Sequence, residues 1–111
     1  LERLEDFEEV RPGDEQWERI VWGDLRDRPG RELGEMGGRP QLGREYFERA
    51  MERLGMRVLV RSHQPDAPTY MFDHRCLTIF TSWAYVPTRT VALWEPGGGL
   101  LDARDLQLEV V

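Results

Sequence analysis

The sequence predicts an α+β fold, with a mostly antiparallel β-sheet and flanking helices, and three observations support this prediction. The chain has 111 residues, of which 40% are hydrophobic and 32% charged, so one globular domain is expected. A strongly amphipathic helix pattern lies in the middle of the sequence. After it come several short segments rich in β-branched and aromatic residues, separated by turn residues. This order of elements is typical of α+β folds.

The first half of the chain predicts two helices, one strand and a long loop. Residues 1–10 have apolar side chains at helical spacing among acids, which predicts a short amphipathic helix. The brief apolar run 20–22 favours a buried strand, and the Gly- and Pro-rich segment 25–42 is expected to be an irregular loop. The strongest helix pattern is 43–55, with one apolar face and Gly55 as a C-terminal stop.

The second half predicts mainly strands. Its first strand, 56–61, contains the apolar run Val58, Leu59 and Val60, which indicates a buried position. Pro96 and the three glycines after it predict a turn. The other strand candidates are rich in β-branched and aromatic residues and cover 70–72, 76–82, 89–95 and 106–111.

Charge and cysteine content exclude several classes of protein. The chain has 15 basic and 21 acidic side chains, a net charge of −6, and all its basic residues are arginine. Such a chain lacks the basic face that binds nucleic acids and anionic membranes, so neither is expected as a partner. Cys76, the single cysteine, excludes an internal disulfide framework. It is expected to be a small buried side chain, and a cytoplasmic location is the simplest interpretation.

A polar cluster, Arg-Ser-His-Gln, begins at Arg61 and directly follows an apolar strand candidate. A strand end fixes the direction of a catalytic or binding side chain, which makes His63 a candidate. Neutral imidazole is a good ligand for transition metals, whereas a lone histidine more often only forms hydrogen bonds in a loop. Both interpretations of His63 are open on these residues alone. His74, at a hairpin-like position, is expected to be a solvated turn residue.

Three segments of the second half share their motifs and their order with a known family. The run 58–64 is an apolar strand leading into Arg-x-His-Gln, Tyr70 and Phe72 form a Tyr-x-Phe pair, and 77–85 has the sequence Leu-Thr-Ile-Phe-Thr-Ser-Trp-Ala-Tyr. Together they resemble the C-terminal part of the phosphoprotein phosphatase (PPP) family, the metal-dependent serine/threonine phosphatases. In that family the last of these segments has the form Leu-x-Thr-x-Phe-Ser-Ala-Pro-Asn-Tyr.

The resemblance extends upstream of these segments. Residues 20–24, Ile-Val-Trp-Gly-Asp, resemble the family's Leu-Leu-Trp-Ser-Asp, and the predicted helix 43–55 resembles the helix before the histidine strand. Between them, Gly34 and Arg39 lie where the family has a loop that contains glycine and arginine. Residues 1–111 are therefore expected to form the C-terminal portion of a calcineurin-like metallophosphatase domain, which is an αββα sandwich.

The resemblance implies a role for four residues. His63 would be a ligand to one metal of a dinuclear divalent centre of Mn, Fe or Zn, and Arg39 would bind the substrate phosphate. Tyr85 would lie on the rim of the site with its hydroxyl near the substrate, and Asp24 would be a polar support there. In the family's reaction, two metal ions clamp the phosphoryl group and activate a bridging water. The implied substrate is a phosphorylated protein or a small phosphoester.

The sequence departs from the family pattern in two ways. Ser82, Trp83 and Ala84 replace the Ala-Pro-Asn before the family's tyrosine, and Trp83 becomes a candidate substrate contact. The Asp-x-His, Gly-Asp-x-x-Asp-Arg and Gly-Asn-His-Glu motifs, expected before this region, do not occur in that order. The chain is therefore expected to lack the N-terminal metal-binding half, which would be its partner in the complete domain. By itself it is expected to bind no metal tightly and to be inactive.

Residues 23–28 permit a second assignment, because their sequence, Gly-Asp-Leu-Arg-Asp-Arg, matches Gly-Asp-x-x-Asp-Arg literally. Asp24 would then bridge two metals and Arg28 would bind phosphate. The absence of Gly-Asn-His-Glu before His63 favours instead the assignment of Asp24 to the family's Trp-x-Asp segment. Two functions stay open. The chain is part of a dinuclear-metal phosphoester hydrolase, most simply a serine/threonine protein phosphatase, or it is a non-catalytic α+β interaction module derived from that fold.

Overall fold

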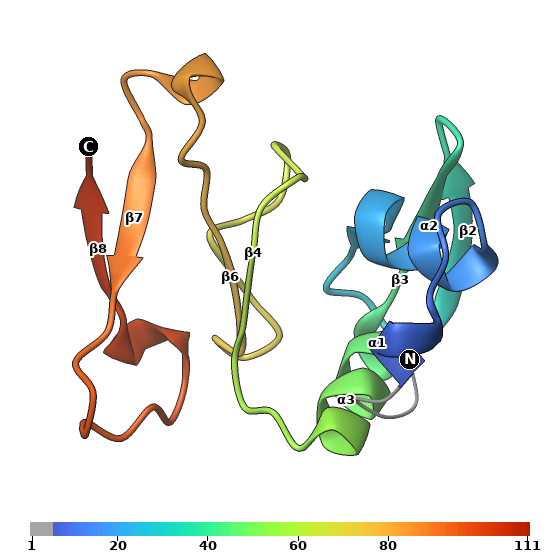
Figure 1. Ribbon diagram of the computed structural model, residues 1–111, viewed down its shortest axis with the longest axis horizontal. Coiled ribbons are helices and arrows are strands. Elements are labelled where there is room, and N and C mark those ends of the chain that lie inside the picture. Colours follow the sequence, from blue (N-terminus) through green and yellow to red (C-terminus); the bar gives the residue numbers. More distant parts are fainter. Residues whose placement is uncertain (1–5) are drawn as a thin grey trace. The chain divides into compact units, whose positions relative to one another are not determined.

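Helices and short strands occur in both halves of the chain, so the predicted α+β fold class is confirmed. The computed structural model describes residues 6–111, and the chain divides into two compact units, Leu1–Met56 and Arg57–Val111 (Figure 1). The predicted helix 1–10 falls partly outside the described residues, within which α1 spans Asp6–Glu9. No helix in the described part of the chain is both long and apolar enough to cross a membrane.

The first unit contains a helix where the apolar run 20–22 predicted a strand, so that prediction was wrong. Helix α2 spans Glu15–Trp22 and begins after Asp14, whose Oδ1 accepts a hydrogen bond of 2.7 Å from the backbone N–H of Trp17. A side-chain cap of this kind satisfies one of the free N–H groups at a helix start. The three apolar residues are therefore the last turn of an amphipathic helix, and all three are exposed by more than a third.

The segment 25–42 is not an irregular loop, as the sequence predicted, but contains most of a three-stranded sheet. Strands β1 (Asp24–Leu25), β3 (Arg39–Leu42) and β2 (Glu32–Met36) lie side by side in that order. β1 is parallel to β3 and β2 is antiparallel to it. Gly37 and Gly38 connect β2 to β3 with φ values of +59° and +76°, the conformation that a two-residue hairpin turn requires.

Helix α3 spans Arg44–Leu54 and confirms the prediction of a helix over 43–55. It buries Phe47 and Met51 on its apolar face. Gly55 ends it in the left-handed conformation, with its N–H directed at carbonyl groups of the last turn. At the other end, the backbone N–H groups of Arg44 and Glu45 donate to the carbonyl groups of the preceding loop at 28–30. This loop therefore caps α3 through its backbone.

The second unit has a three-stranded sheet in the order β4 (Leu59–Arg61), β6 (Cys76–Thr78), β5 (Tyr70–Met71). β4 is parallel to β6 and β5 is antiparallel to it. The strands predicted at 56–61, 70–72 and 76–82 are all present, although each is shorter than its predicted range. The residues of β4 are half-buried or exposed, with Val60 47% exposed, so the prediction that this strand is buried was wrong. Cys76 is fully buried, as expected.

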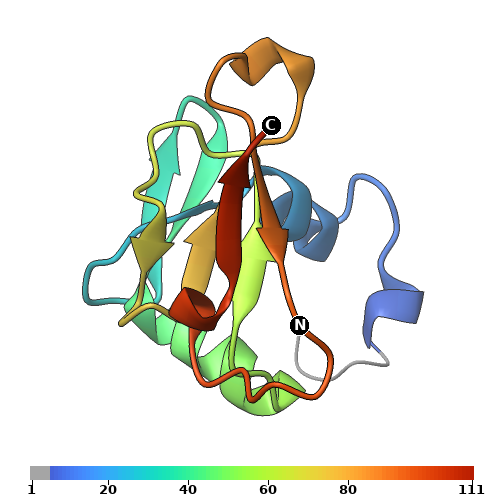
Figure 2. The ribbon, with the colours of Figure 1, turned by 90° about the vertical axis from the view of Figure 1, so that its left-hand side faces the viewer.

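An antiparallel pair, β7 (Thr90–Leu93) and β8 (Gln107–Val110), completes the second unit and confirms the last two predicted strands. In Figure 2 this pair lies in front of the three-stranded sheet. The core between them is formed by Leu77 of β6 with Ala103 and Leu106, and Leu108 packs against it. Ala103 belongs to the short helix η2 (Ala103–Asp105), which is held by a capping box between Asp102 and Asp105.

Candidate functional site

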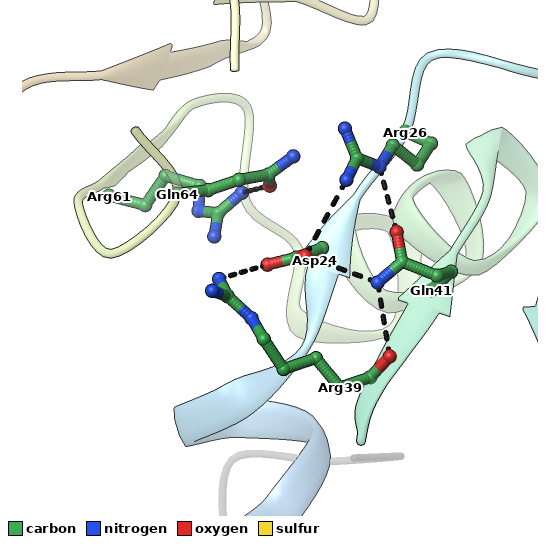
Figure 3. A network of polar contacts seen from close by, with 6 residues as sticks. All are labelled: Asp24, Arg26, Arg39, Gln41, Arg61 and Gln64. Atoms are coloured by element: carbon green, nitrogen blue, oxygen red, sulfur yellow. Dashed lines mark hydrogen bonds and ion pairs between the residues drawn. The ribbon is translucent and has the colours of Figure 1, made fainter. Parts of the chain in front are cut away.

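Asp24 is a buried carboxylate at the centre of a polar network in the first unit (Figure 3). It is 4% exposed and lies opposite Gln41 in the parallel pairing of β1 with β3. Its Oδ1 accepts a hydrogen bond from Nη2 of Arg39. Its Oδ2 accepts one of 3.1 Å from Nε2 of Gln41 and lies 3.6 Å from Nη2 of Arg26. Two guanidinium groups and an amide thus replace the water that this carboxylate loses on burial.

Gln41 links the members of this network. Its Nε2 donates both to Asp24 and to the backbone carbonyl of Arg39, the latter at 3.0 Å. Its Oε1 accepts a hydrogen bond of 2.8 Å from Nε of Arg26. A buried amide that uses both its donor and its acceptor holds its neighbours in one geometry, because any shift leaves a polar group unsatisfied.

The structure brings two of the four predicted site residues, Asp24 and Arg39, into direct contact. The Arg39 side chain is about one-third exposed, whereas that of Asp24 is almost completely buried. A guanidinium group has five N–H donors, so binding to one carboxylate leaves it able to bind an anion as well. Asp24 is surrounded by arginine side chains, a position compatible with the polar support predicted for it. Arg28, the phosphate ligand of the second assignment, is exposed.

His63 lies two residues after β4 in the second unit, between two residues that bind each other. Nη1 of Arg61 donates a hydrogen bond of 2.6 Å to Oε1 of Gln64, as Figure 3 also shows. Gln64 is 0% exposed, and its backbone carbonyl accepts a hydrogen bond of 3.1 Å from the N–H of Ala67. The chain is therefore fixed on both sides of His63, which is itself half-buried.

The backbone of His63 has a φ value of +80°, which few residues other than glycine adopt. Such a conformation costs on the order of 1–3 kcal/mol and persists only where the surrounding structure imposes it. The Arg61–Gln64 hydrogen bond spans this residue and supplies such a constraint. Phe72, Asp73 and His74 also have positive φ values, so this conformation is not specific to His63.

Tyr85 ends a short helical turn, η1 (Trp83–Tyr85). Its ring lies against the ring of Phe80, with the two centroids 4.3 Å apart and the planes tilted by 34°. Trp83 is 77% exposed, and the guanidinium carbon of Arg89 lies 5.2 Å from its ring centroid. The turn thus presents an aromatic surface to solvent next to a tyrosine whose ring is held by Phe80.

The strand topology brings His63 and the Tyr85 turn to the same edge of the second unit's sheet. β4 is parallel to β6, with Arg61 opposite Thr78. His63 follows the carboxyl end of β4, and the turn follows the carboxyl end of β6 (Figure 1). The carboxyl edge of parallel strands is a usual place for ligands, because loops that leave it converge.

The residues that the structure describes do not by themselves fit a dinuclear metal centre. Among residues 6–111, no three His, Cys, Asp or Glu side chains come together in a group that could hold a metal ion. Each metal of such a centre needs several protein ligands, and the favoured assignment of the family resemblance implies only His63 as one of them. His74 is exposed, as expected for a solvated turn residue. The described residues can therefore supply only some of the protein ligands of such a centre.

Several residues of these networks were not singled out from the sequence. Gln41 and Arg26 become important only through the pairing of β1 with β3, which brings together residues 15 to 17 positions apart. No local pattern indicates such a pairing. Gln64 could have been found, since it directly follows His63 in the Arg-x-His-Gln motif and a buried glutamine needs a partner.

Two curated proteins are similar in sequence to this chain. Serine/threonine-protein phosphatase T of Aspergillus oryzae is 31% identical over 71 residues, which are 62% of this chain and 15% of that protein. Serine/threonine-protein phosphatase with EF-hands 2 of Mus musculus is 32% identical over 82 residues, which are 68% of this chain and 11% of that protein. The chain is related to the serine/threonine protein phosphatases of the PPP family.

The PPP relationship confirms the resemblance found in the sequence motifs. It applies to a portion of these phosphatases, since the match spans about one-seventh of the length of one relative and one-ninth of the other. No family model matches the chain, and no solved structure matches it significantly.

Proposed function

We propose that residues 1–111 form part of a phosphoester hydrolase of the serine/threonine phosphatase type. The main support is that His63 and the Tyr85 turn follow neighbouring parallel strands at their carboxyl ends, in a chain related to PPP phosphatases. The proposed substrate is a phosphoserine or phosphothreonine side chain of a protein, and small phosphoesters are alternative substrates.

Four residues have proposed roles in this reaction. His63 provides one nitrogen ligand to a divalent metal centre of Mn, Fe or Zn, whose other ligands belong to the N-terminal half of the same domain. Arg39 binds the substrate phosphate, because a guanidinium group matches two phosphate oxygens at once. Asp24 supports Arg39, and the hydroxyl of Tyr85 contacts the substrate on the rim of the site.

The proposed roles of Arg39 and His63 are each supported by a neighbouring constraint. The guanidinium group of Arg39 donates a hydrogen bond to Asp24, and the backbone carbonyl of Arg39 accepts one from Gln41. His63 is held in a strained backbone conformation between Arg61 and Gln64. Fixing functional side chains before the substrate arrives lowers the entropy cost of reaching the reactive geometry.

The test is to express the full open reading frame that contains these residues and to assay phosphate release from a phosphoserine peptide with Mn²⁺. Wild-type protein is expected to release phosphate, and His63→Ala is expected to lower kcat/KM by about a hundredfold or more, as loss of a metal ligand or its support does. His74→Ala is the matched control, because His74 is an exposed histidine of the same unit. It is expected to retain wild-type turnover.

Two results would contradict this proposal. Full turnover by His63→Ala would reject the role of the imidazole. No phosphate release by the wild-type reading frame would reject the enzyme and would favour the alternative, a non-catalytic α+β interaction module derived from the same fold.

A further inference from the structure

A small cationic pocket lies within the first unit. It encloses about 40 Å³, and its wall is formed mainly by four arginines, a tyrosine and a glutamine: Gln16, Arg19, Arg31, Tyr46, Arg49 and Arg53. The first two come from α2 and the last three from α3, two helices of this unit that Figure 1 labels. Four guanidinium groups around one cavity are unexpected in a chain whose net charge is −6.

The sequence of α3 accounts for one side of this pocket. Arg49 and Arg53 follow Tyr46 by three and seven residues, so the three side chains lie on the same face of the helix. Ala50 also lines the cavity, and its small side chain leaves room between the longer ones. Arg44, in the same helix, is paired instead with Glu48 one turn further along, at 3.6 Å.

The arginines of this pocket are only partly neutralised. Nη2 of Arg19 lies 2.5 Å from carboxylate oxygens of both Glu15 and Glu32. In the part of the chain that the structure describes, neither Arg31 nor Arg49 forms an ion pair with an acidic side chain. Among residues 6–111, Arg31 and Arg49 therefore carry positive charge that no carboxylate pairs with, and an anion beside them would lower their electrostatic energy.

Tyr46 adds a hydrogen-bond donor to the same cavity. Burial raises the pKa of its phenol, while the nearby charges of Arg19 and Arg31 lower the pKa by a smaller amount. The hydroxyl therefore stays protonated near neutral pH and can donate a hydrogen bond to an anionic oxygen.

We propose that this pocket binds a phosphate-sized oxyanion, either as free phosphate or as the phosphoryl group of an exposed phosphoserine. Guanidinium groups bind pairs of phosphate oxygens in a fork, and the tyrosine hydroxyl completes the set of donors. A cavity of about 40 Å³ has room for one small group of a few heavy atoms, since a single water molecule needs about 10–15 Å³ of such space. A nucleoside or a sugar ring would have to stay outside it.

The test is isothermal titration calorimetry of the 111-residue chain with sodium phosphate at constant ionic strength. We expect saturable binding at one site. Arg31→Gln and Arg49→Gln should each weaken it about tenfold, because each removes a charge-assisted hydrogen bond. Arg57→Gln is the matched control, since Arg57 is exposed like Arg31 and Arg49 but does not line the pocket. It should leave the affinity within about twofold of wild type.

A second titration distinguishes the two sources of the anion. If a phosphoserine peptide binds more tightly than free phosphate and its unphosphorylated form does not bind, the ligand of the pocket is a phosphorylated protein. Equal affinity for the peptide and free phosphate assigns it to the small anion. Arg49→Lys, which keeps the charge but loses the fork, should bind several-fold more weakly than wild type, and it serves in place of Arg49→Gln if that variant does not fold.

Two results would overturn the proposal. One is the absence of saturable phosphate binding to the wild-type chain. The other is an equal loss of affinity in Arg49→Gln and Arg57→Gln, which would show a general effect of charge rather than a site. The heat of binding is measured without turnover, so these results are independent of whether the chain belongs to a phosphatase.

Discussion

Nη2 of Arg39 donates a hydrogen bond to Oδ1 of Asp24, so the cation proposed to bind phosphate is held by the acid proposed to support it. The contact joins the first residue of β1 to the first residue of β3, across a parallel pairing. The two side chains should therefore depend on each other for their positions. A change in either side chain alters the environment of the other.

The Asp24→Asn substitution should lower the free energy of unfolding by about 2 kcal/mol, because it removes the charge that compensates Arg39 and Arg26 in a buried network. The measurement is equilibrium unfolding in urea. Asp27→Asn is the matched control: it breaks the more exposed pair of Asp27 with Arg44 and should cost less than about 1 kcal/mol. A double-mutant cycle of Asp24→Asn with Arg39→Gln should give a coupling energy of about 1 kcal/mol or more, and additive effects would contradict the contact.

Replacing Gly43 by alanine should destabilise the chain by about 1–3 kcal/mol. A Cβ atom at Gly43 would lie 2.2 Å from the backbone carbonyl oxygen of Gly30, in the loop that caps α3, and a backbone atom cannot move aside cheaply. Gly99→Ala is the control, because nothing lies within 4 Å of a Cβ there. Thermal unfolding followed by circular dichroism compares the two, and equal melting temperatures would contradict the close approach of the loop to α3.

The strain at His63 predicts an unusual order of stability among its variants. His63→Gly should be about 1 kcal/mol more stable than His63→Ala, because glycine adopts a φ value of +80° without steric cost and alanine does not. Both variants lack the imidazole, so the comparison separates backbone strain from side-chain contacts. Urea unfolding of the two proteins measures the difference. A more stable alanine variant would indicate that the left-handed conformation is not imposed at this position.

The carboxylate of Asp102 predicts how the stability of the folded state changes at acidic pH. Its hydrogen bonds with the side chain and then the backbone N–H of Arg104 lower its pKa from 3.8 to about 2. A carboxylate whose pKa is lower in the folded state stabilises that state above its unfolded pKa, and this contribution is lost as the pH falls from 3.8 to about 2. In Asp102→Asn, the loss of stability over this interval should be smaller than in wild type. Glu95→Gln removes a different acid from the same unit and is the control.

The elements that could be predicted from the sequence are those with a complete local signal. The helix at 43–55 combines a periodic apolar face with a glycine stop, and residues 44–54 are helical. The run 20–22 predicts a strand because three apolar residues in succession suit either structure. The helix there depends on the cap at Asp14, which lies eight residues before the end of the run. The hairpin of β2 and β3 was missed although Gly37 and Gly38 signal its turn, because the strands beside them are polar and exposed.

The candidate site could be predicted only where a motif is continuous in the sequence. Arg61, His63 and Gln64 are neighbours, and their motif led to the relationship that the comparisons confirm. The network of Asp24 and Arg39 depends on strand pairing between distant segments, so its partners could not be derived from either segment alone. The cationic pocket was missed for a similar reason, since α2 contributes two of its residues and the segment before β2 another.

The single thiol of this chain, at Cys76, gives a direct readout of how often β6 opens. Its residue is 0% exposed, and β6 pairs with a strand on each side. A reagent such as a disulfide dye can modify this sulfur only when the central strand separates from its neighbours, so the labelling rate reports the population of that opened state. Residues of the first unit can then be substituted and the same rate measured, to learn whether the two halves of the chain unfold together or independently.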